Sequence, residues 1–286
     1  MVKQSHRIER SSQGVLGFTG FLGLRGLALA AAAAAAAFAC AGSTRGLVPP
    51  GTPEPDKYLF ERGTEALTGK KWVLARDYFK QVVETYTQSP YRPDAKIGIG
   101  DTYFNEGSSE SYVLAINEFR EFLSFYPTNS RADYAQYKLA MSHFRQMRAA
   151  QRDQTETREA IKEFNVFLDR YPMSALLLEV RDRLREARDR QDEADYRVGF
   201  FYFRQRWYPG AVDRFKTLLQ EDPAYSGRDA VYFYLAESLV KMKRDAEALP
   251  YYERLEQDFG QSTYLEDARK RIAELKAPAQ SKSSGG

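Results

Sequence analysis

Residues 115–127 read AINEFREFLSFYP, and this stretch carries the pattern that decides the fold. The small Ala115 is followed one helical turn later by Phe119, and then by Tyr126 and Pro127. Side chains one turn apart share a helix face, so the alanine lets a second helix approach closely while the ring fills the space beside it. The proline cannot continue the helix. The stretch therefore predicts the second helix of a packed helix pair.

The alanine and aromatic pair recurs along the chain. It is found at five places, which are Ala75/Phe79, Ala115/Phe119, Ala160/Phe164, Ala211/Phe215 and Ala248/Tyr252. Helix pairs of about 34 residues with this pair and a later proline are typical of tetratricopeptide repeats (TPRs). The alanines are 40, 45, 51 and 37 residues apart, so the repeats are irregular. With almost no alternating strand pattern, the chain is predicted to be an all-α TPR solenoid of about five repeats.

The repeats predict a single solenoid domain at residues 57–276. A three-then-four apolar spacing from Leu177 to Phe201 predicts one long helix, or two nearly collinear ones. Pro250 lies early in the second helix of the last repeat, where a proline is tolerated only in the first turn, so it argues mildly against perfect regularity. Residues 277–286 are rich in Ser, Gly and Lys and are predicted to form a disordered tail. The expected repeats are 58–90, 93–127, 131–172, 190–223 and 228–260, followed by a capping helix at 262–275.

Cys40 is the only cysteine, and it follows an apolar run that comes after a basic N-terminus. The uncharged residues 26–39 would rise only about 21 Å as a helix, short of the roughly 30 Å hydrocarbon core. An export signal at residues 1–39 is therefore favoured over a membrane-spanning anchor. Ala37-Phe38-Ala39-Cys40 resembles the lipobox of bacterial lipoproteins, in which the cysteine is lipidated and becomes the new N-terminus. Plain secretion and a retained anchor are the alternatives.

The predicted signal accounts for the net positive charge. The chain has 42 Lys+Arg and 39 Asp+Glu, and removal of residues 1–39, with four basic groups and one acid, leaves 38 of each. A balanced total gives no electrostatic reason to expect nucleic acid or an anionic membrane face as a partner. Residues 40–56 hold four prolines with Gly, Ser and Thr, which is the composition of a linker.

The predicted mature chain offers no catalytic or metal-binding set. His143 is its only histidine, and without a second histidine or cysteine the usual zinc or iron ligands are missing. Gly98 and Gly100 open no helix and follow no strand, so they are not a phosphate loop. We therefore expect no enzymatic activity and no cofactor, and we expect His143 to be a helix-surface or packing residue. A helical lytic transglycosylase would need a catalytic domain for which no segment is left.

A solenoid of helix pairs instead offers an extended surface for a peptide. The chain has 19 tyrosines, and a tyrosine supplies contact area and one hydroxyl at low entropic cost. Tyr91, Tyr103, Tyr134 and Tyr137, on the first helices of the second and third repeats, are the predicted groove residues. First-helix aromatics also pack against the neighbouring repeat, so both interpretations stay open for these four side chains.

Several segments resemble the YfiO (BamD) family of bacterial outer-membrane lipoproteins. The most specific is DQTETREAI at residues 153–161, because generic TPRs do not need this connection between two helices. The resemblance runs from about Tyr58 to Leu275, and the lipoprotein signal and proline-rich linker add to it. The other segments are residues 79–86, 89–91, 132–137 and 171–174.

The resemblance implies a scaffold of the β-barrel assembly (BAM) machine, which inserts β-barrel proteins into the outer membrane. In the family, the first repeats form a pocket proposed to receive targeting segments of unfolded outer-membrane proteins. The last repeats dock BamA through its periplasmic POTRA domains, and an arginine in the fourth repeat's second helix makes an ion pair across that interface. Arg214 occupies the matching position.

The resemblance also implies a location at the periplasmic face of the outer membrane, with a lipid anchor on Cys40 and with other Bam subunits as partners. The alternative is another periplasmic TPR adaptor lipoprotein, such as the TPR partner of the Tol-Pal system. That family usually carries an N-terminal coiled coil before its repeats, and none is visible between Cys40 and Tyr58.

Overall fold

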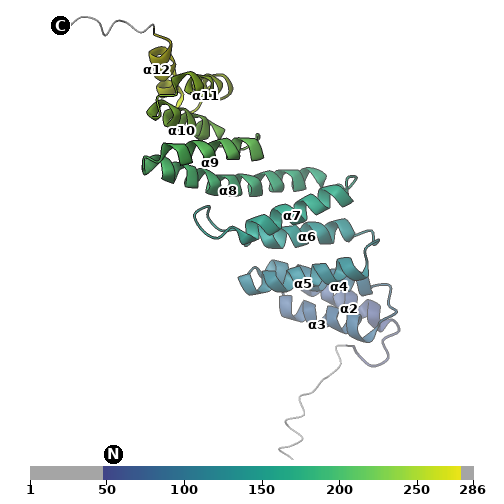
Figure 1. Cartoon of the computed structure of the whole chain (residues 1–286). Helices are drawn as coiled ribbons and strands as arrows, with labels where there is room; N and C mark the ends of the chain where they lie inside the picture. The colour runs from purple at the N-terminus through teal and green to yellow at the C-terminus, as the bar shows by residue number, and fades with distance from the viewer. Residues whose placement is uncertain (1–47, 278–286) are drawn as a thin grey trace, which may run out of the picture. The chain divides into compact units, whose positions relative to one another are not determined.

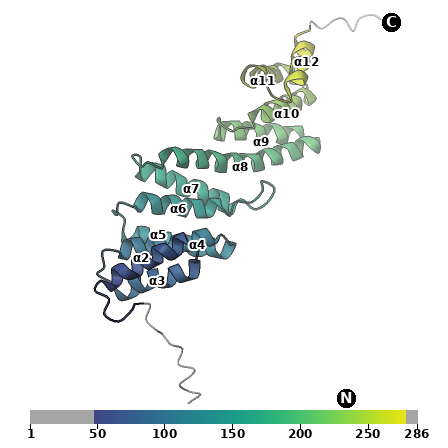
Figure 2. The ribbon, with the colours of Figure 1, turned by 180° about the vertical axis from the view of Figure 1, so that it is seen from behind.

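The computed structural model describes residues 48–277, which form helices and contain no strand. Consecutive helices pack against each other as antiparallel neighbours in chain order (Figures 1 and 2). The predicted all-α, TPR-type helical-repeat fold is confirmed. The predictions for residues 1–39, for Cys40 and for the end of the chain fall outside the described residues.

The helices are α2 (Pro55–Thr68), α3 (Trp72–Thr85), α4 (Arg92–Glu106), α5 (Ser109–Phe125), α6 (Ala132–Phe144), α7 (Thr155–Arg170), α8 (Leu177–Arg204), α9 (Tyr208–Glu221), α10 (Arg228–Lys241), α11 (Asp245–Asp258) and α12 (Leu265–Lys276).

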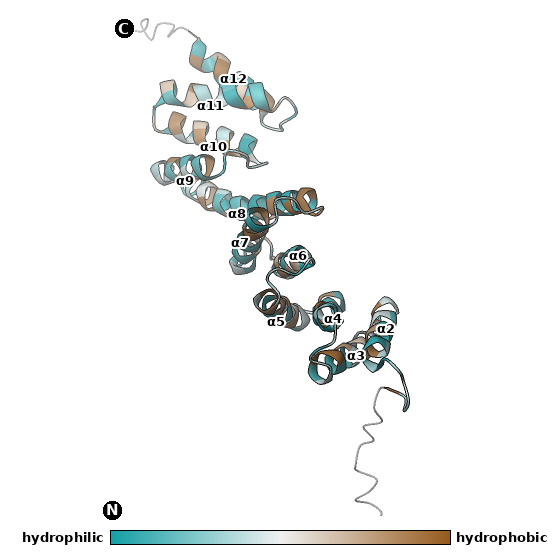
Figure 3. Cartoon of the chain, turned by 90° about the vertical axis from the view of Figure 1, so that its right-hand side faces the viewer, coloured by the Kyte–Doolittle hydropathy of each residue, from teal (hydrophilic) through white to brown (hydrophobic). Residues whose placement is uncertain are grey.

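The alanine and aromatic pairs form the centre of each helix pair. They lie on α3, α5, α7, α9 and α11, and every one of the ten side chains is at most 1% exposed. Burial of one such aromatic ring stabilises the fold by about 1.5–3 kcal/mol. These helices are amphipathic, and apolar (brown) and polar (teal) residues both occur along the ribbon (Figure 3). The pattern that predicted the fold is therefore also its core.

Glycines on the first helices give these rings their space. A Cβ at Gly98 of α4, or at Gly63 of α2, would lie 2.6 Å from the Phe79 ring. Phe79 is thus held between two first helices, and neither helix could carry a larger residue there without moving. Gly100 approaches Phe119 in the same way, at 2.6 Å. Gly98 and Gly100 thus allow close helix approach, which outweighs their cost of about 1 kcal/mol each in helix propensity.

The fourth helix pair is longer than the others because α8 is one continuous helix of 28 residues. This agrees with the apolar spacing that predicted a long helix, and the start of α8 at Leu177 lies before residue 190, where the fourth repeat was expected to begin. Arg185 connects α8 to the loop after α9, with Nη2 at 3.1 Å from Asp192 and 2.6 Å from Asp222. The expected domain and repeat boundaries stay a prediction.

Pro250 is the sixth residue of α11, which begins at Asp245. It therefore lies beyond the first turn, the only place where a proline was expected to be tolerated. A proline at this position removes one backbone hydrogen bond within the helix. The ring is exposed, and the buried Ala248, Tyr252 and Leu255 hold the rest of α11 against its neighbours. Tertiary packing therefore maintains the helix across the proline. Within residues 48–277, no helix has the length and apolar run needed to cross a bilayer.

Candidate functional site

The first helices of the pairs are linked to one another along the described unit. Backbone proximity joins α2 to α4, α4 to α6 and α8 to α10, and a side-chain hydrogen bond joins α6 to α8. We call the surface that α2, α4, α6, α8 and α10 share the first-helix face. The predicted groove tyrosines all lie on its N-terminal half: Tyr91 precedes α4, Tyr103 is on α4, and Tyr134 and Tyr137 are on α6. All four are half-buried, so each combines packing with an exposed portion.

Tyr91 and Tyr103 contact different neighbouring residues. The Tyr91 ring stacks on Phe60 of α2, with ring centroids 5.3 Å apart and planes 19° from parallel. The Tyr103 ring lies under the guanidinium of Arg76, a residue of α3, at 4.3 Å. Tyr91 thus packs between two first helices, whereas Tyr103 contacts the second helix of the preceding pair. Tyr103 and Tyr134 pack against the same core cluster, Tyr137 packs against the next one, and Tyr91 belongs to neither.

Tyr134 belongs to a polar and aromatic network between α4 and α6. Its hydroxyl donates a hydrogen bond to Asp101 Oδ1 at 2.9 Å. Lys138, one turn further along α6, places Nζ 3.7 Å from the same oxygen and 3.9 Å from the centre of the Phe104 ring. An ammonium over an aromatic face is attracted by the electrons of the ring. The network therefore fixes one acid, one base and two rings at the seam between two repeats.

Burial controls the protonation of this network. It raises the pKa of Asp101 against the opposing charge of Lys138, and it lowers the pKa of Lys138 in spite of Asp101. Burial also raises the pKa of Tyr134, with Asp101 acting in the same direction. The phenol thus stays protonated and remains a donor at neutral pH. The Tyr134 hydroxyl, Asp101 and Lys138 thus satisfy one another, and their contacts hold the Tyr134 ring and the Lys138 cation in fixed positions.

Tyr137 makes the corresponding contact to the next first helix. Its hydroxyl donates to Glu179 Oε1 on α8 at 2.7 Å. Burial and the Glu179 carboxylate together raise the pKa of Tyr137. Because Tyr134 contacts α4 and Tyr137 contacts α8, α6 is joined by a tyrosine to each neighbouring first helix. Sequence reasoning identified these two tyrosines and missed Asp101, Phe104 and Lys138, and the only available signal was Lys138 one helical turn after Tyr134.

The C-terminal half of the first-helix face is lined by aromatic rings that the sequence analysis did not single out. Tyr234 of α10 lies edge-on to two rings of α8, with centroids 4.8 Å from Phe200 and 5.1 Å from Phe203. Phe233 stacks on Tyr264, which precedes α12, at 4.9 Å. Burial raises the pKa of Tyr234 to about 12, so this phenol is a neutral donor as well.

Arg214 and His143 lie away from the first-helix tyrosines. Arg214 is exposed on α9, and it forms no ion pair with another residue of the described unit. His143 is buried on α6, with Nδ1 at 2.7 Å from Glu156 and Nε2 at 3.3 Å from Arg120. Of the two roles expected for His143, the structure therefore favours packing.

The chain matches a family model described as "YfiO: Outer membrane lipoprotein" over residues 53–249. The chain belongs to the YfiO family. Relatives named "Outer membrane protein assembly factor BamD" are 27% identical over 209 residues in Caulobacter vibrioides, with 73% of this chain and 68% of the relative covered. The relative in Xylella fastidiosa is 22% identical over 179 residues, with 59% of this chain and 60% of the relative covered. The relative in Vibrio cholerae is 22% identical over 197 residues, with 65% of this chain and 78% of the relative covered.

Solved structures similar to this YfiO-family chain include TPR proteins. The TPR2AB-domain:pHSP90-complex of yeast Sti1 matches with a TM-score of 0.46 and 13% identity, with 77% of this chain and 82% of that chain covered. A MamA structure matches with a TM-score of 0.33 and 18% identity, with 74% and 96% covered. These similarities are too low to carry an argument about binding.

Proposed function

We propose that this chain is the outer-membrane lipoprotein scaffold of the BAM complex. The observation that carries the proposal is the YfiO family match across residues 53–249, together with relatives named as BamD outer membrane protein assembly factors. The scaffold would gather BamA, other Bam subunits and unfolded β-barrel proteins at the periplasmic face of the outer membrane. A lipid on Cys40 would tether it there. Its contribution is binding and positioning, with no chemical step.

Arg214 is the proposed contact to a BamA POTRA domain. Its guanidinium is exposed and is not engaged in an ion pair within the described residues, so it can pair with a carboxylate of another protein. Ion pairs to a guanidinium are charge-assisted and directional, which suits an interface that must hold a fixed orientation. The first-helix tyrosines lie on other helices, which leaves that face available for a second partner.

Charge reversal at this position tests the BamA contact. We expect Arg214→Glu to weaken BamA binding about tenfold or more, because a like-charge contact replaces an attractive one. The measurement is recovery of partners with the tagged protein from native membranes in mild detergent, quantified by mass spectrometry. Arg214→Lys keeps the charge and should retain most of the binding. Arg254→Glu, at an exposed position on α11, is the matched control.

Two results would count against the proposal in different ways. Unchanged BamA recovery with Arg214→Glu would remove the role of that residue and leave the scaffold function intact. Recovery of Tol-Pal proteins in place of a barrel protein with POTRA domains would overturn the BAM assignment and support the alternative adaptor.

The N-terminal half of the first-helix face is the proposed site for unfolded β-barrel proteins. Tyr91, Tyr103, Tyr134 and Tyr137 present partly exposed rings there, and Lys138 adds a cation that is held beside the buried Asp101. An extended segment with alternating aromatic and polar side chains can contact rings and hydrogen-bonding groups together. Because the tyrosine hydroxyls already bind Asp101 and Glu179, the rings would supply most of the new contact.

Variants of Tyr137 separate ring contact from hydroxyl contact. We expect Tyr137→Ala to weaken binding of a labelled C-terminal strand peptide of an outer-membrane β-barrel about tenfold, as truncation of a central aromatic contact does. Tyr137→Phe keeps the ring and should bind nearly as well as the natural chain. The measurement is fluorescence anisotropy, with helix content followed by circular dichroism. Tyr251→Ala on the second helix α11 is the control, and equal losses in both alanine variants would contradict the site.

A further inference from the structure

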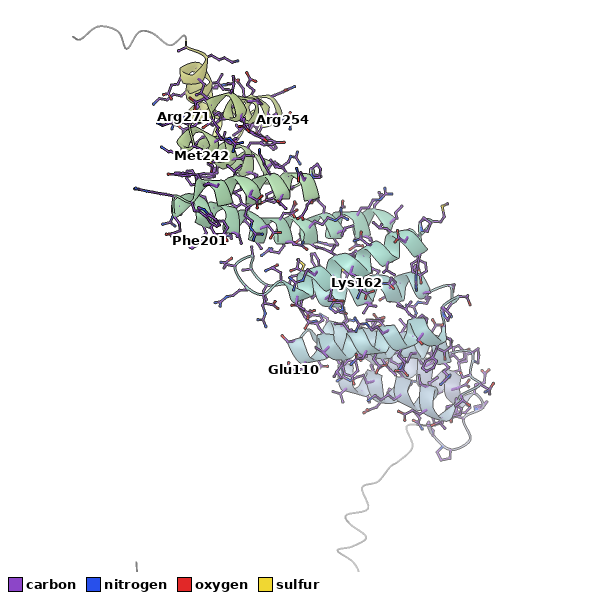
Figure 4. The ribbon with its side chains drawn as sticks, in the orientation of Figure 1. Glu110, Lys162, Phe201, Met242, Arg254 and Arg271 are labelled. Atoms are coloured by element: carbon purple, nitrogen blue, oxygen red, sulfur yellow. The ribbon has the colours of Figure 1, made fainter. Side chains whose placement is uncertain are left out.

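Three consecutive helix-pair turns share one side of the described unit. They are the turns between α6 and α7, between α8 and α9, and between α10 and α11, and antiparallel helices place every such turn at the same edge. Figure 4 shows Phe201 and Met242, beside the second and third of these turns, on the same side of the ribbon, where the α6–α7 segment also projects in Figure 1. We call residues 145–152, 198–207 and 241–244 together the turn edge.

The turn edge is strongly basic. Its cations are exposed, and apart from Arg244, which pairs with Glu247, none forms an ion pair with another described residue. Outside that pair, Asp153 and Asp245 are the acids that directly follow these segments in the sequence. The loops at the opposite edge, before α8, α10 and α12, contain no Lys or Arg, and Asp222 is their one charged residue. A net charge near zero thus conceals a local concentration of cations at this edge. The unpaired turn-edge cations are Arg145, Arg148, Arg152, Arg204, Arg206, Lys241 and Lys243.

Large apolar side chains protrude among these cations. Val198 is 40% exposed, Phe201 56% and Trp207 55%, all at the α8–α9 turn. The Trp207 ring meets Tyr202 edge-on at 4.7 Å, and a Cβ at Gly210 would lie 2.6 Å from it. The exposed indole is thus held in one position by its neighbours. Exposed tryptophan that is fixed in place, with no partner covering it in the described unit, marks an interaction surface.

We propose that the turn edge binds the surface of a membrane that contains anionic phospholipid. Tryptophan favours the membrane–water interface, and each Lys or Arg close to an anionic leaflet adds to the attraction. The edge is a row of protruding turns, and five cavities on the described unit are lined by other segments. A bilayer surface accepts protruding rings without a shaped recess, whereas a protein hot spot usually fits into a pocket.

This contact is separate from the proposed lipid on Cys40, and it does not depend on membership of a BAM complex. A lipid chain would hold one end of the protein at the bilayer without fixing its orientation. Binding through the turn edge would orient the solenoid, with the α8–α9 turn towards the headgroups and the opposite loops away from them. The balanced total charge gave no reason to expect this, because it takes no account of where the charges lie.

Fluorescence of Trp207 tests the contact directly. The full-length protein, purified from membranes and carrying Trp72→Phe, keeps Trp207 as its only tryptophan. It is reconstituted into phosphatidylethanolamine vesicles with or without phosphatidylglycerol, both containing brominated lipid as quencher. We expect at least twofold stronger quenching in the anionic vesicles. The variant Arg148→Glu/Arg152→Glu/Arg204→Glu/Lys243→Glu should lose this difference, and should partition onto added anionic vesicles at least about tenfold less.

A matched variant reverses four exposed cations outside the turn edge: Arg170→Glu, Arg181→Glu, Arg254→Glu and Lys270→Glu. It changes the net charge equally and should keep the quenching. Equal quenching in both vesicle types, or equal losses in the two fourfold variants, would overturn the proposal. Unchanged quenching in the turn-edge variant, together with loss of a co-purifying protein, would identify the edge as a protein-binding surface and would also overturn it.

Discussion

Replacing Phe79 with alanine is expected to lower the free energy of unfolding of the first helix pair by about 3–5 kcal/mol. The Phe79 ring is 1% exposed and is held between Gly63 of α2 and Gly98 of α4. Truncation leaves a cavity where three helices meet, and the glycines on both sides have no side chain that could fill it. The loss therefore includes the transfer energy of the ring and the cost of the cavity.

Amide hydrogen exchange followed helix by helix is the appropriate measurement. Helical-repeat proteins are stabilised by each repeat and its neighbours, so exchange in α2, α3 and α4 should accelerate by about 100-fold or more while α10 to α12 change little. Phe125→Ala is the control, because this phenylalanine is 65% exposed at the end of α5 and its loss should cost less than about 0.5 kcal/mol. Equal acceleration in both variants would show that Phe79 is not a core contact.

The helices were predictable because the interactions that form them are local in the sequence. An alanine and an aromatic residue one turn apart mark the place where the two helices of a pair come closest. In the structure, every such alanine and aromatic side chain is buried. The apolar spacing from Leu177 to Phe201 gave α8 for the same reason. The position of Pro250 beyond the first turn could not be predicted, because the sequence shows only the missing hydrogen bond. The packing of Tyr252 and Leu255 that compensates for it comes from the neighbouring helices.

The candidate sites could be predicted only in part, because their contacts join distant segments. The sequence placed Tyr134 and Tyr137 on the correct helix, but the acceptors are 33 residues earlier at Asp101 and 42 residues later at Glu179. Which side chains meet there depends on the rotation and stagger of one helix pair on the next. The turn edge was missed for a related reason: its cations come from three turns that only antiparallel stacking brings to one side.

The last helix, α12, is attached through a buried carboxylate. Glu237 of α10 is 7% exposed. Its Oε1 accepts hydrogen bonds from Arg271 Nε at 2.6 Å and from the Tyr252 hydroxyl at 2.5 Å, and its Oε2 accepts from Arg271 Nη2 at 3.1 Å. A carboxylate taken out of water in this way is stable only while the guanidinium stays beside it. The network joins the last helix pair to the helix that ends the solenoid.

Arg271→Met is accordingly expected to cost about 2–4 kcal/mol, because it leaves the charge of Glu237 buried with only the Tyr252 hydroxyl as partner. Exchange should accelerate in α12 first and then in α10 and α11. Adding Glu237→Gln to Arg271→Met removes the unpaired charge, and it should restore more than half of the loss in a double-mutant cycle followed by urea unfolding. Arg269→Met is the control, since this arginine pairs with Glu256 and Glu266 at the surface and should cost less than about 1 kcal/mol. If the double variant were as unstable as Arg271→Met, the loss would reflect missing side-chain packing, and the buried charge would not be what holds the terminal helix.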